Sequence, residues 1–407
     1  MDEAIALITD RAEVLPATTV ALADAAGRVL AEDVVSALDL PPFANSAMDG
    51  FALRSVDTVD AGSDSPARLR LTGESRAGAP AQLQLLSGCA MRISTGAAMP
   101  EGADAVIRVE HAVLEEDELL ASAPIAAAQD VRPAGDDIAR GQTVLRAGEL
   151  IGAGELAMLS SIGEDRVSVR ARPRVAVIAT GDELVVPGQP LAHGQIYDSN
   201  SLMLAELVRA AGAELVSLST RVADERPAVD AALGLGLKDC DVLIVCGGVS
   251  MGEHDHVKAA LAGAGVEQVF WQVALRPGHP TWFGALRRAD GSETLVLGLP
   301  GNPVSAYVTF QLFATAALSC LSGADRRPLM LTARFRGQSV RKKLGFTQAL
   351  RCRLFDDGGD LVAELTAPNQ RSHAVSSTVG TDALALLGQD LTELSSGDSV
   401  RVQLLRS

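Results

Sequence analysis

The sequence predicts a multidomain protein with a doubly wound, largely parallel α/β domain, a β-rich insertion domain, a stalk and a C-terminal small β-barrel. Three observations carry this prediction. Strand-like and helix-like runs alternate from residue 172 onward, short strand-like runs between Gly- and Pro-rich turns occupy residues 41–135, and short, punctuated strand-like runs return after residue 325. Alternation of strands with helices implies right-handed crossovers and hence a parallel sheet.

The predicted α/β domain spans residues 172–325. It starts with RVAVIAT (174–180), a continuous run rich in β-branched residues that is typical of a strand buried on both faces. The following strands are expected at residues 213–220, 241–248, 266–275 and 293–301. The helices are expected at residues 199–212, 227–237, 255–265 and 302–323. The last helix is apolar over residues 307–321, but its Thr, Gln and Ser side chains indicate a buried helix and not a membrane span.

The other domains are predicted on either side of this unit. Residues 1–26 are expected to form one helix that ends at a turn on Gly27. The chain is divided into an N-terminal helix with a stalk-like domain (1–40 and 136–171), the β-rich insertion domain (41–135), the α/β domain (172–325) and the C-terminal β-barrel domain (326–407).

Composition excludes several classes of function. The 407 residues carry a net charge of −16, whereas binding to nucleic acid or to an anionic membrane needs a positive face that displaces counterions. The N-terminus has no basic segment before an apolar core, so no signal peptide is expected. Five scattered cysteines without a CxxC pair fit reduced thiols. We therefore expect a cytoplasmic protein without nucleic-acid or membrane partners.

Two glycine-containing turns follow strands of the predicted sheet. Gly247-Gly248-Val249-Ser250 follows the third strand, and Leu299-Pro300-Gly301-Asn302-Pro303-Val304-Ser305 follows the last strand, directly before a helix. Ligands of open α/β sheets bind at the carboxyl ends of the strands. Glycine lets a ligand approach the backbone, and N–H groups at a helix N-terminus attract anions. Either turn alone is explained as a tight connection, but two on one rim favour a phosphate or oxyanion site.

Three carboxylates follow three different strands. Glu183 comes after the first strand, Asp224 after the second and Asp255 after the third. If they converge, Mg²⁺ is the cation that best relieves their repulsion, because it accepts a few carboxylates together with waters and phosphate oxygens. Each one alone is explained equally well as a helix cap or a solvated side chain. As a set on one rim, they favour a metal site.

Two further patterns give weaker indications. The segment Gly248-Val249-Ser250-Met251-Gly252 matches the GxSxG elbow of hydrolases, but that fold needs an acid and then a histidine later in the chain, His373 lies in the C-terminal β region, and no HGGG-like oxyanion loop is present. The string PPFANSAMDGFA (41–52) combines a stiff Pro-Pro segment with a turn that presents Asp49. On physical grounds alone, this string is explained most simply as an interdomain linker.

Several strings occur in the order and approximate spacing of the molybdopterin molybdenumtransferases, the family of MoeA and the gephyrin E-domain. They are PPFANSAMDGFAL, RISTGAAMPEGADAVIRVE, GDDI, VIATGDEL, GQIYDSNS, CGGVSMGEHD, RPG and GLPGNPVSA. The resemblance covers residues 5–325 by motif and the C-terminal region by its β pattern. It implies an elongated four-domain subunit whose α/β domain is similar to the pterin adenylyltransferase, and a homodimer with a cleft shared between subunits. It also implies the reaction, which is Mg²⁺-dependent insertion of molybdate into adenylylated molybdopterin with release of AMP.

The resemblance assigns roles to single residues. The catalytic residues that it implies are Asp49, Glu183, Asp224 and Asp255, and the last three would hold Mg²⁺. The substrate-binding residues that it implies are Thr95, Asp137, Asp198, Gly247, Gly248, Ser250, Arg276, His279, Pro300, Gly301, Asn302, Pro303 and Ser305. It makes Asp49 a cleft residue that is delivered across the dimer interface. Molybdopterin adenylyltransferase and molybdoenzyme acceptors are the protein partners that it suggests.

The chain departs from this family at Arg276-Pro277-Gly278-His279, where many members have two lysines. Arg276 keeps a permanent cation that can hold an oxyanion bidentately, whereas a histidine at position 279 supplies no fixed charge. Molybdate or tungstate preference is therefore open, and a tungstate-selective paralogue is one alternative. A gephyrin-type scaffold that binds a protein partner is another, although the retained carboxylates disfavour it. The pterin adenylyltransferase itself would have no use for residues 27–171.

Overall fold

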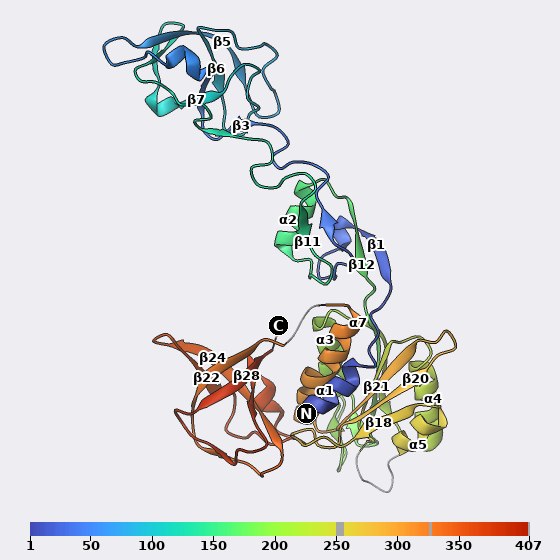
Figure 1. Ribbon diagram of the computed structural model, residues 1–407. Helices are drawn as coiled ribbons and strands as arrows, with labels where there is room; N and C mark the ends of the chain where they lie inside the picture. The colour runs from blue at the N-terminus through green and yellow to red at the C-terminus, as the bar shows by residue number, and fades with distance from the viewer. Residues whose placement is uncertain (250–255, 325–327, 406–407) are drawn as a thin grey trace.

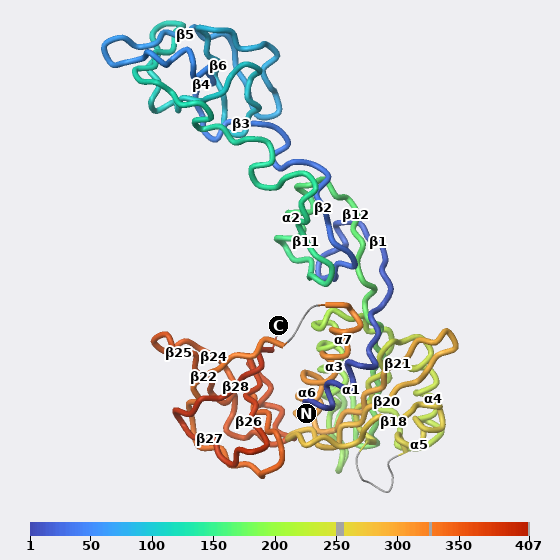
Figure 2. Tube along the Cα trace, in the orientation of Figure 1, coloured from blue at the N-terminus to red at the C-terminus, as the bar shows by residue number. Residues whose placement is uncertain are grey.

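The computed structural model describes residues 1–249, 256–324 and 328–405 of an elongated molecule. A β-rich unit lies at one end, a slender stalk lies in the middle, and an α/β unit and a C-terminal β unit lie side by side at the other end (Figure 1). The chain trace passes through the stalk twice (Figure 2). The predicted fold class, a multidomain α/β protein with additional β units, is confirmed.

The α/β unit is built on a six-stranded sheet with the order β16-β13-β17-β21-β20-β18. Its parallel strands are β16 (Glu214–Val222), β13 (Arg174–Thr180), β17 (Val242–Cys246) and β21 (Glu293–Leu299). Two antiparallel strands complete one edge, β20 (Trp282–Arg287) and β18 (Glu267–Trp271). All residues of β13 after Arg174 are buried, as its β-branched composition predicts.

Helices cover both faces of this sheet. The helices α4 (Arg226–Gly236) and α5 (His256–Gly263) pack on one face. The other face carries α1 (Asp2–Thr9), α3 (Asn200–Ala210) and a continuous helix made of α6 (Pro303–Thr309), the π-helical turn η4 (Phe310–Ala314) and α7 (Thr315–Leu321). This last helix is long and apolar enough to cross a membrane, but 72% of the tested window is buried against the protein. It is therefore a core helix.

The N-terminal segment differs from the prediction of one helix over residues 1–26. Only α1 is α-helical, and it is followed by β1 (Ala17–Ala21) and a 3₁₀ turn, η1 (Leu22–Asp24). Pro16 cannot donate a backbone hydrogen bond to a helix, and the β-branched run Thr18-Thr19-Val20 favours an extended chain. The strand β1 instead pairs along its whole length with β12 (Arg166–Arg170).

The stalk joins the α/β unit to the distal β unit. It consists of the β1–β12 pair, the pair of β2 (Val34–Val35) with β11 (Thr143–Leu145), and the helix α2 (Ala153–Ser161). A small apolar core that includes Leu30, Ile151 and Val169 holds these elements together. The backbone N–H of Ser36 donates to the Gln142 carbonyl at 2.9 Å, so the outgoing and returning segments run side by side.

The distal unit is a six-stranded sheet with the order β7-β4-β6-β5-β9-β8. Its strands are β4 (Gly50–Leu53), β5 (Ala67–Ser75), β6 (Cys89–Ile93), β7 (Ala105–Arg108), β8 (Val113–Glu115) and β9 (Glu118–Ala121). Short 3₁₀ turns are η2 (Ser55–Thr58) and η3 (Val109–His111). The pair of β3 (Asn45–Ser46) with β10 (Val131–Arg132) lies where the chain enters and leaves the unit.

The C-terminal unit is a closed barrel of five strands. The strands β24 (Thr347–Asp357), β25 (Asp360–Leu365), β22 (Met330–Arg336), β28 (Ser399–Leu404) and β26 (Ala383–Leu387) follow one another, and pairing of β26 with β24 closes the circle. A 3₁₀ turn, η5 (Val375–Thr378), packs against α6. A short strand of the α/β unit, β19 (Leu275–Arg276), adds to β24 in parallel and joins the two units.

Removing the side chain of Leu318 should destabilise the α/β unit. Leu318 is 1% exposed within the main core, so Leu318→Ala should leave a cavity and lower the free energy of unfolding by about 3 kcal/mol. The measurement is urea unfolding followed by far-UV circular dichroism. Leu235→Ala, at a position that is 70% exposed, is the matched control and should change the stability by less than about 0.5 kcal/mol. Equal effects of the two variants would contradict this description of the core.

Candidate functional site

An acidic cluster lies at the carboxyl end of β13. The glycine after this strand, Gly181, has φ +148°, a backbone conformation that favours glycine. Asp182 accepts a hydrogen bond from the backbone N–H of Asp224 at 3.1 Å. Burial raises the pKa of the Asp224 carboxyl, the negative charges of Asp182 and Glu183 raise this pKa further, and His256 opposes the shift. The three carboxylates therefore lie close enough for their negative charges to repel one another.

The acidic cluster has the charge that a divalent cation needs. Glu183 and Asp182 are exposed, and the half-buried Asp224 feels the charges of both. In residues 1–249, 256–324 and 328–405, no three His, Cys, Asp or Glu side chains are close enough to form a complete metal site. Asp255, the third predicted ligand, lies outside the described residues. Asp182 was not among the predicted site residues, although it stands beside Glu183 in the string TGDEL.

The two predicted glycine turns lie next to one another beside this cluster. A Cβ on Gly301 would lie 3.7 Å from the Gly247 Cα. Gly247 has φ +94°, and a Cβ there would meet the Thr180 carbonyl oxygen at 2.8 Å, so this glycine is also required for packing. The backbone N–H of Val304 donates to the Ser372 carbonyl at 3.1 Å, which means that it is not free for an anion as the sequence suggested. Ser250 lies outside the described residues.

Asp198 and Asn200 lie at the start of α3, and Asn200 holds the second turn in place. Asp198 is 5% exposed and accepts hydrogen bonds from the backbone N–H and the hydroxyl of Ser201, so this predicted substrate-binding residue caps the helix. Asn200, which the sequence did not single out, donates through Nδ2 to the Gly301 carbonyl at 2.7 Å. Burial raises the pKa of the Cys246 thiol to about 12, and this thiol donates to the Pro300 carbonyl.

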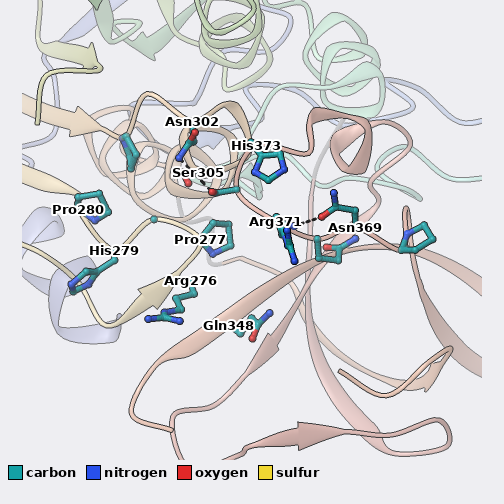
Figure 3. Close-up of a pocket in the computed structure, with 15 residues that line it drawn as sticks. Arg276, Pro277, His279, Pro280, Asn302, Ser305, Gln348, Asn369, Arg371 and His373 are labelled. Atoms are coloured by element: carbon teal, nitrogen blue, oxygen red, sulfur yellow. Dashed lines mark hydrogen bonds between the residues drawn. The ribbon is translucent and has the colours of Figure 1, made fainter. Parts of the chain in front are cut away.

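A cavity of about 620 Å³ lies between the α/β unit and the C-terminal barrel (Figure 3). Five of its lining residues, Arg276, His279, Pro300, Asn302 and Ser305, were predicted to bind substrate. The sequence missed those from the barrel side, which are Gln348, Pro368, Asn369, Gln370, Arg371, Ser372 and His373. The fifteen described residues that line the cavity include two arginines and two histidines but neither Asp nor Glu. In a chain with a net charge of −16, this composition favours an anion.

The turn with Arg276 and His279 is fixed by its surroundings. The Nδ1–H of His279 donates to the Val273 carbonyl at 2.8 Å, because a carbonyl can only accept, and this leaves Nε2 for a ligand. Gly278 has φ +117°, and a Cβ there would lie 2.4 Å from Thr309 Cγ2 in the core helix. The cationic side of the cavity is therefore packed directly against the α/β core.

The remaining predicted residues lie elsewhere in the same chain. Asp49 stands between β3 and β4, where its Oδ1 accepts a hydrogen bond from the backbone N–H of Thr95 at 2.8 Å. Asp137 lies where the chain returns to the stalk, and its N–H donates to the Leu40 carbonyl at 3.0 Å. The side chains of Asp49, Thr95 and Asp137 are all exposed. Because the distal unit lies at the opposite end of the molecule from the α/β sheet (Figure 1), one chain does not bring Asp49 to the acidic cluster.

Comparison with known proteins identifies relatives over nearly the whole chain. Three family models match, the MoeA N-terminal region (domain I and II) at residues 1–163, a probable molybdopterin binding domain at residues 176–319, and the MoeA C-terminal region (domain IV) at residues 336–405. The chain is 34% identical over 385 residues to the molybdopterin molybdenumtransferase of Haemophilus influenzae, covering 94% of this chain and 92% of that protein. It is 36% identical over 390 residues to that of Synechococcus elongatus, covering 95% and 94%.

Solved structures agree with this result. A molybdopterin biosynthesis MoeA protein from Pyrococcus horikosii superimposes with a TM-score of 0.82 at 30% sequence identity, covering 99% of this chain and 98% of that chain. The similarity thus includes the distal unit, the stalk, the α/β unit and the barrel.

The raised pKa of Asp224 predicts a pH-dependent gain in stability for Asp224→Asn. In the folded protein the carboxyl keeps its proton above its ordinary pKa of 3.8, so the free energy of unfolding falls as pH rises from that value through the raised one. The uncharged amide of Asp224→Asn removes this loss of stability. The variant should therefore unfold at a higher temperature than the wild type at about pH 8, and the difference should shrink toward about pH 4. Asp239→Asn, at an exposed position of the same unit, is the control. A difference that grows on acidification would contradict the prediction.

Proposed function

The chain belongs to the MoeA family of molybdopterin molybdenumtransferases, which insert molybdate into molybdopterin, and we propose that its substrates are molybdate and adenylylated molybdopterin and that AMP is released. One observation carries the proposal. An anion pocket without acidic residues and an acidic cluster lie on neighbouring turns of one sheet edge, joined through the contact of Gly247 with Gly301. An oxyanion and a metal-bound phosphate need this combination of charges side by side.

We propose that molybdate occupies the anion pocket. Arg276 and Arg371 would supply two permanent charges for a dianion, and guanidinium groups hold tetrahedral oxyanions through paired N–H donors. The hydroxyls of Ser305 and Ser372 line the same cavity and can donate to the remaining oxygens. Since Nδ1–H of His279 is used by the Val273 carbonyl, its Nε2 would donate to the oxyanion only in the doubly protonated form of the ring. The pocket thus offers charge and hydrogen-bond donors to a dianion without a lysine at either position of the turn.

We propose that Glu183 and Asp224, together with Asp255, hold Mg²⁺. When bound, Mg²⁺ would neutralise phosphate oxygens of the adenylylated substrate. The exposed Asp182 adds negative charge and fixes the Asp224 backbone through its hydrogen bond, so we infer that it positions the site. The mutual repulsion of these carboxylates in the folded protein supports a cation at this edge.

We propose that Asp49 acts in the cleft of a second subunit. The elongated shape supports this, because the distal unit of one subunit can reach the α/β unit of another but not its own (Figure 1). Thr95 holds Oδ1 of Asp49, and Oδ2 would orient the oxygen that attacks the adenylylated phosphate. Asp137 would reach the same cleft from the outer end of the stalk. Exposed apolar side chains at Ile196, Tyr197 and Leu202 offer surface for association.

We propose that the protein works in the cytoplasm. The five cysteines are free, and four of them are buried, which suits a reducing compartment.

Release of AMP tests the reaction. Wild-type protein with adenylylated molybdopterin, molybdate and Mg²⁺ should release AMP, and removing Mg²⁺ by chelation should slow the release at least about tenfold. Glu183→Gln should show a similar loss, because it removes a ligand charge while keeping the side-chain size. Asp239→Asn should retain full activity. The released AMP is measured by chromatography. If the wild-type protein releases none, the proposed reaction is refuted.

A mixing experiment tests the shared cleft. Asp49→Ala and Asp224→Ala should each abolish AMP release, because each damages every cleft of its own homodimer. After exchange of subunits, half of the dimers would combine both variants and carry one intact cleft, so the mixture should regain about a quarter of the wild-type rate. Mixing Asp49→Ala with Asp137→Ala, two residues of the same side of the cleft, should restore nothing. If the subunits exchange freely and the mixture of Asp49→Ala with Asp224→Ala stays inactive, the shared cleft is excluded.

A further inference from the structure

Phe346 stands where the C-terminal barrel meets the cationic turn of the α/β unit. It directly precedes β24, and the peptide group that joins it to Thr347 is held by two hydrogen bonds. Lys342 Nζ donates to the Phe346 carbonyl at 2.7 Å, and the backbone N–H of Thr347 donates to the Ala274 carbonyl at 2.8 Å. The ring is half-buried. Its position is therefore fixed by contacts with both units.

Three nitrogen-bearing side chains surround this ring. The Arg276 guanidinium carbon lies 4.5 Å from the ring centroid, and Lys343 Nζ lies 5.6 Å from it. The His279 ring meets it edge to face, with 5.4 Å between centroids. Two of these side chains, Arg276 and His279, line the anion pocket. One aromatic ring therefore contacts both Arg276 and His279 in the lining of the pocket.

We propose that Phe346 is a positioning residue for the oxyanion, because its ring holds the Arg276 guanidinium in place before the anion binds. The inference rests on the proposed function, since it names the residue that organises the molybdate pocket. An exposed arginine has many rotamers, and ordering them on binding costs affinity. A ring stacked on the guanidinium restricts these rotamers through a cation–π interaction.

Stacking has an advantage over an ion pair at this place. A carboxylate partner would hold Arg276 equally well, but it would occupy N–H donors and cancel the charge that attracts the anion. A ring under the guanidinium leaves the N–H donors at its edge available for a ligand. Within the described part of the chain, Arg276 makes no ion pair and no side-chain hydrogen bond, so its donors are not used by the protein.

The register between the two units determines this contact. Arg276 on β19 pairs with Gln348 on β24, and both side chains line the cavity. Phe346 lies in a bend directly before β24, two residues before Gln348. The strand pairing thus brings the start of β24, where the ring lies, next to Arg276.

The barrel contains a matched control for this interaction. Arg336 lies over the ring of Phe355, on the same strand β24, at 4.2 Å. This guanidinium is already engaged, since it forms ion pairs with Asp357 and Glu364. Neither Phe355 nor Arg336 lines the cavity. Loss of the Phe355 ring therefore removes a comparable stacking contact without touching the pocket.

The test compares the dependence of AMP release on molybdate concentration in four proteins, the wild type, Phe346→Leu, Phe346→Tyr and Phe355→Leu. Phe346→Leu should raise the KM for molybdate about three- to tenfold, the range that a partly exposed cation–π contact supports, with little change in kcat. Phe346→Tyr keeps an aromatic face and should behave like the wild type. Phe355→Leu should leave the KM unchanged.

Two further measurements make the outcome decisive. In the first, molybdate alone is titrated into each protein by calorimetry. Absence of AMP release would overturn the proposed reaction, but the dissociation constants for molybdate would still test the role of Phe346. Phe346→Leu is also made in an Arg276→Ala background, where it should have no additional effect on molybdate affinity. Equal molybdate affinity in Phe346→Leu and the wild type would overturn the inference, as would an undiminished effect of Phe346→Leu in the Arg276→Ala background. If Phe346→Leu does not fold, Phe346→Met replaces it in both comparisons.

Discussion

Backbone pairing between β19 and β24 fixes the C-terminal barrel against the α/β unit, and the cavity that we propose as an anion pocket exists because of this contact. The pairing is short, with Leu275 opposite Thr347 and Arg276 opposite Gln348. It aligns a turn of one unit with a strand and a loop of the other, so that neither unit alone contains the pocket lining. A shift of one residue would turn Gln348 away from the cavity, since side chains alternate along a strand.

The site separates opposite charges over a short distance. Carboxylates gather after β13, whereas arginine and histidine side chains gather at the other side of the two glycine turns. The two turns lie between them, and the neutral side chains of Asn200 and Cys246 donate to backbone carbonyls of the second turn. Carboxylates placed inside the pocket would pair with Arg276 or Arg371 and reduce its affinity for an anion. The separation keeps both groups available for ligands of opposite charge.

Local patterns predicted those parts of the structure whose cause is local. The β-branched run at 174–180 gives β13 with the predicted bounds, because burial on both faces selects such residues. The N-terminal prediction was wrong because Pro16 and the β-branched residues after it outweighed the helical spacing, and because the partner strand β12 is distant in the sequence. The strand β20 was not predicted from the sequence.

The residues of the candidate site also differ in whether the local sequence could predict them. Glu183 and Asp224 follow strands of one sheet, so chain order was enough to expect them at one edge. Arg371 and His373 come from a loop of the barrel, and only the docking of two units brings them beside Arg276. The placement of Asp49 in a shared cleft came from family resemblance, because no periodicity encodes a contact between subunits.

The paired segments of the stalk have a consequence for the order of folding. The strands β1 and β12 can meet only after the chain between them, which contains the whole distal unit, has been brought back on itself. Closing so long a flexible loop costs conformational entropy that grows with its length. A distal unit that folds first holds its two ends together, as Leu40 and Ile138 do through their backbone hydrogen bonds. Its folding therefore shortens the effective loop and makes the stalk easier to form.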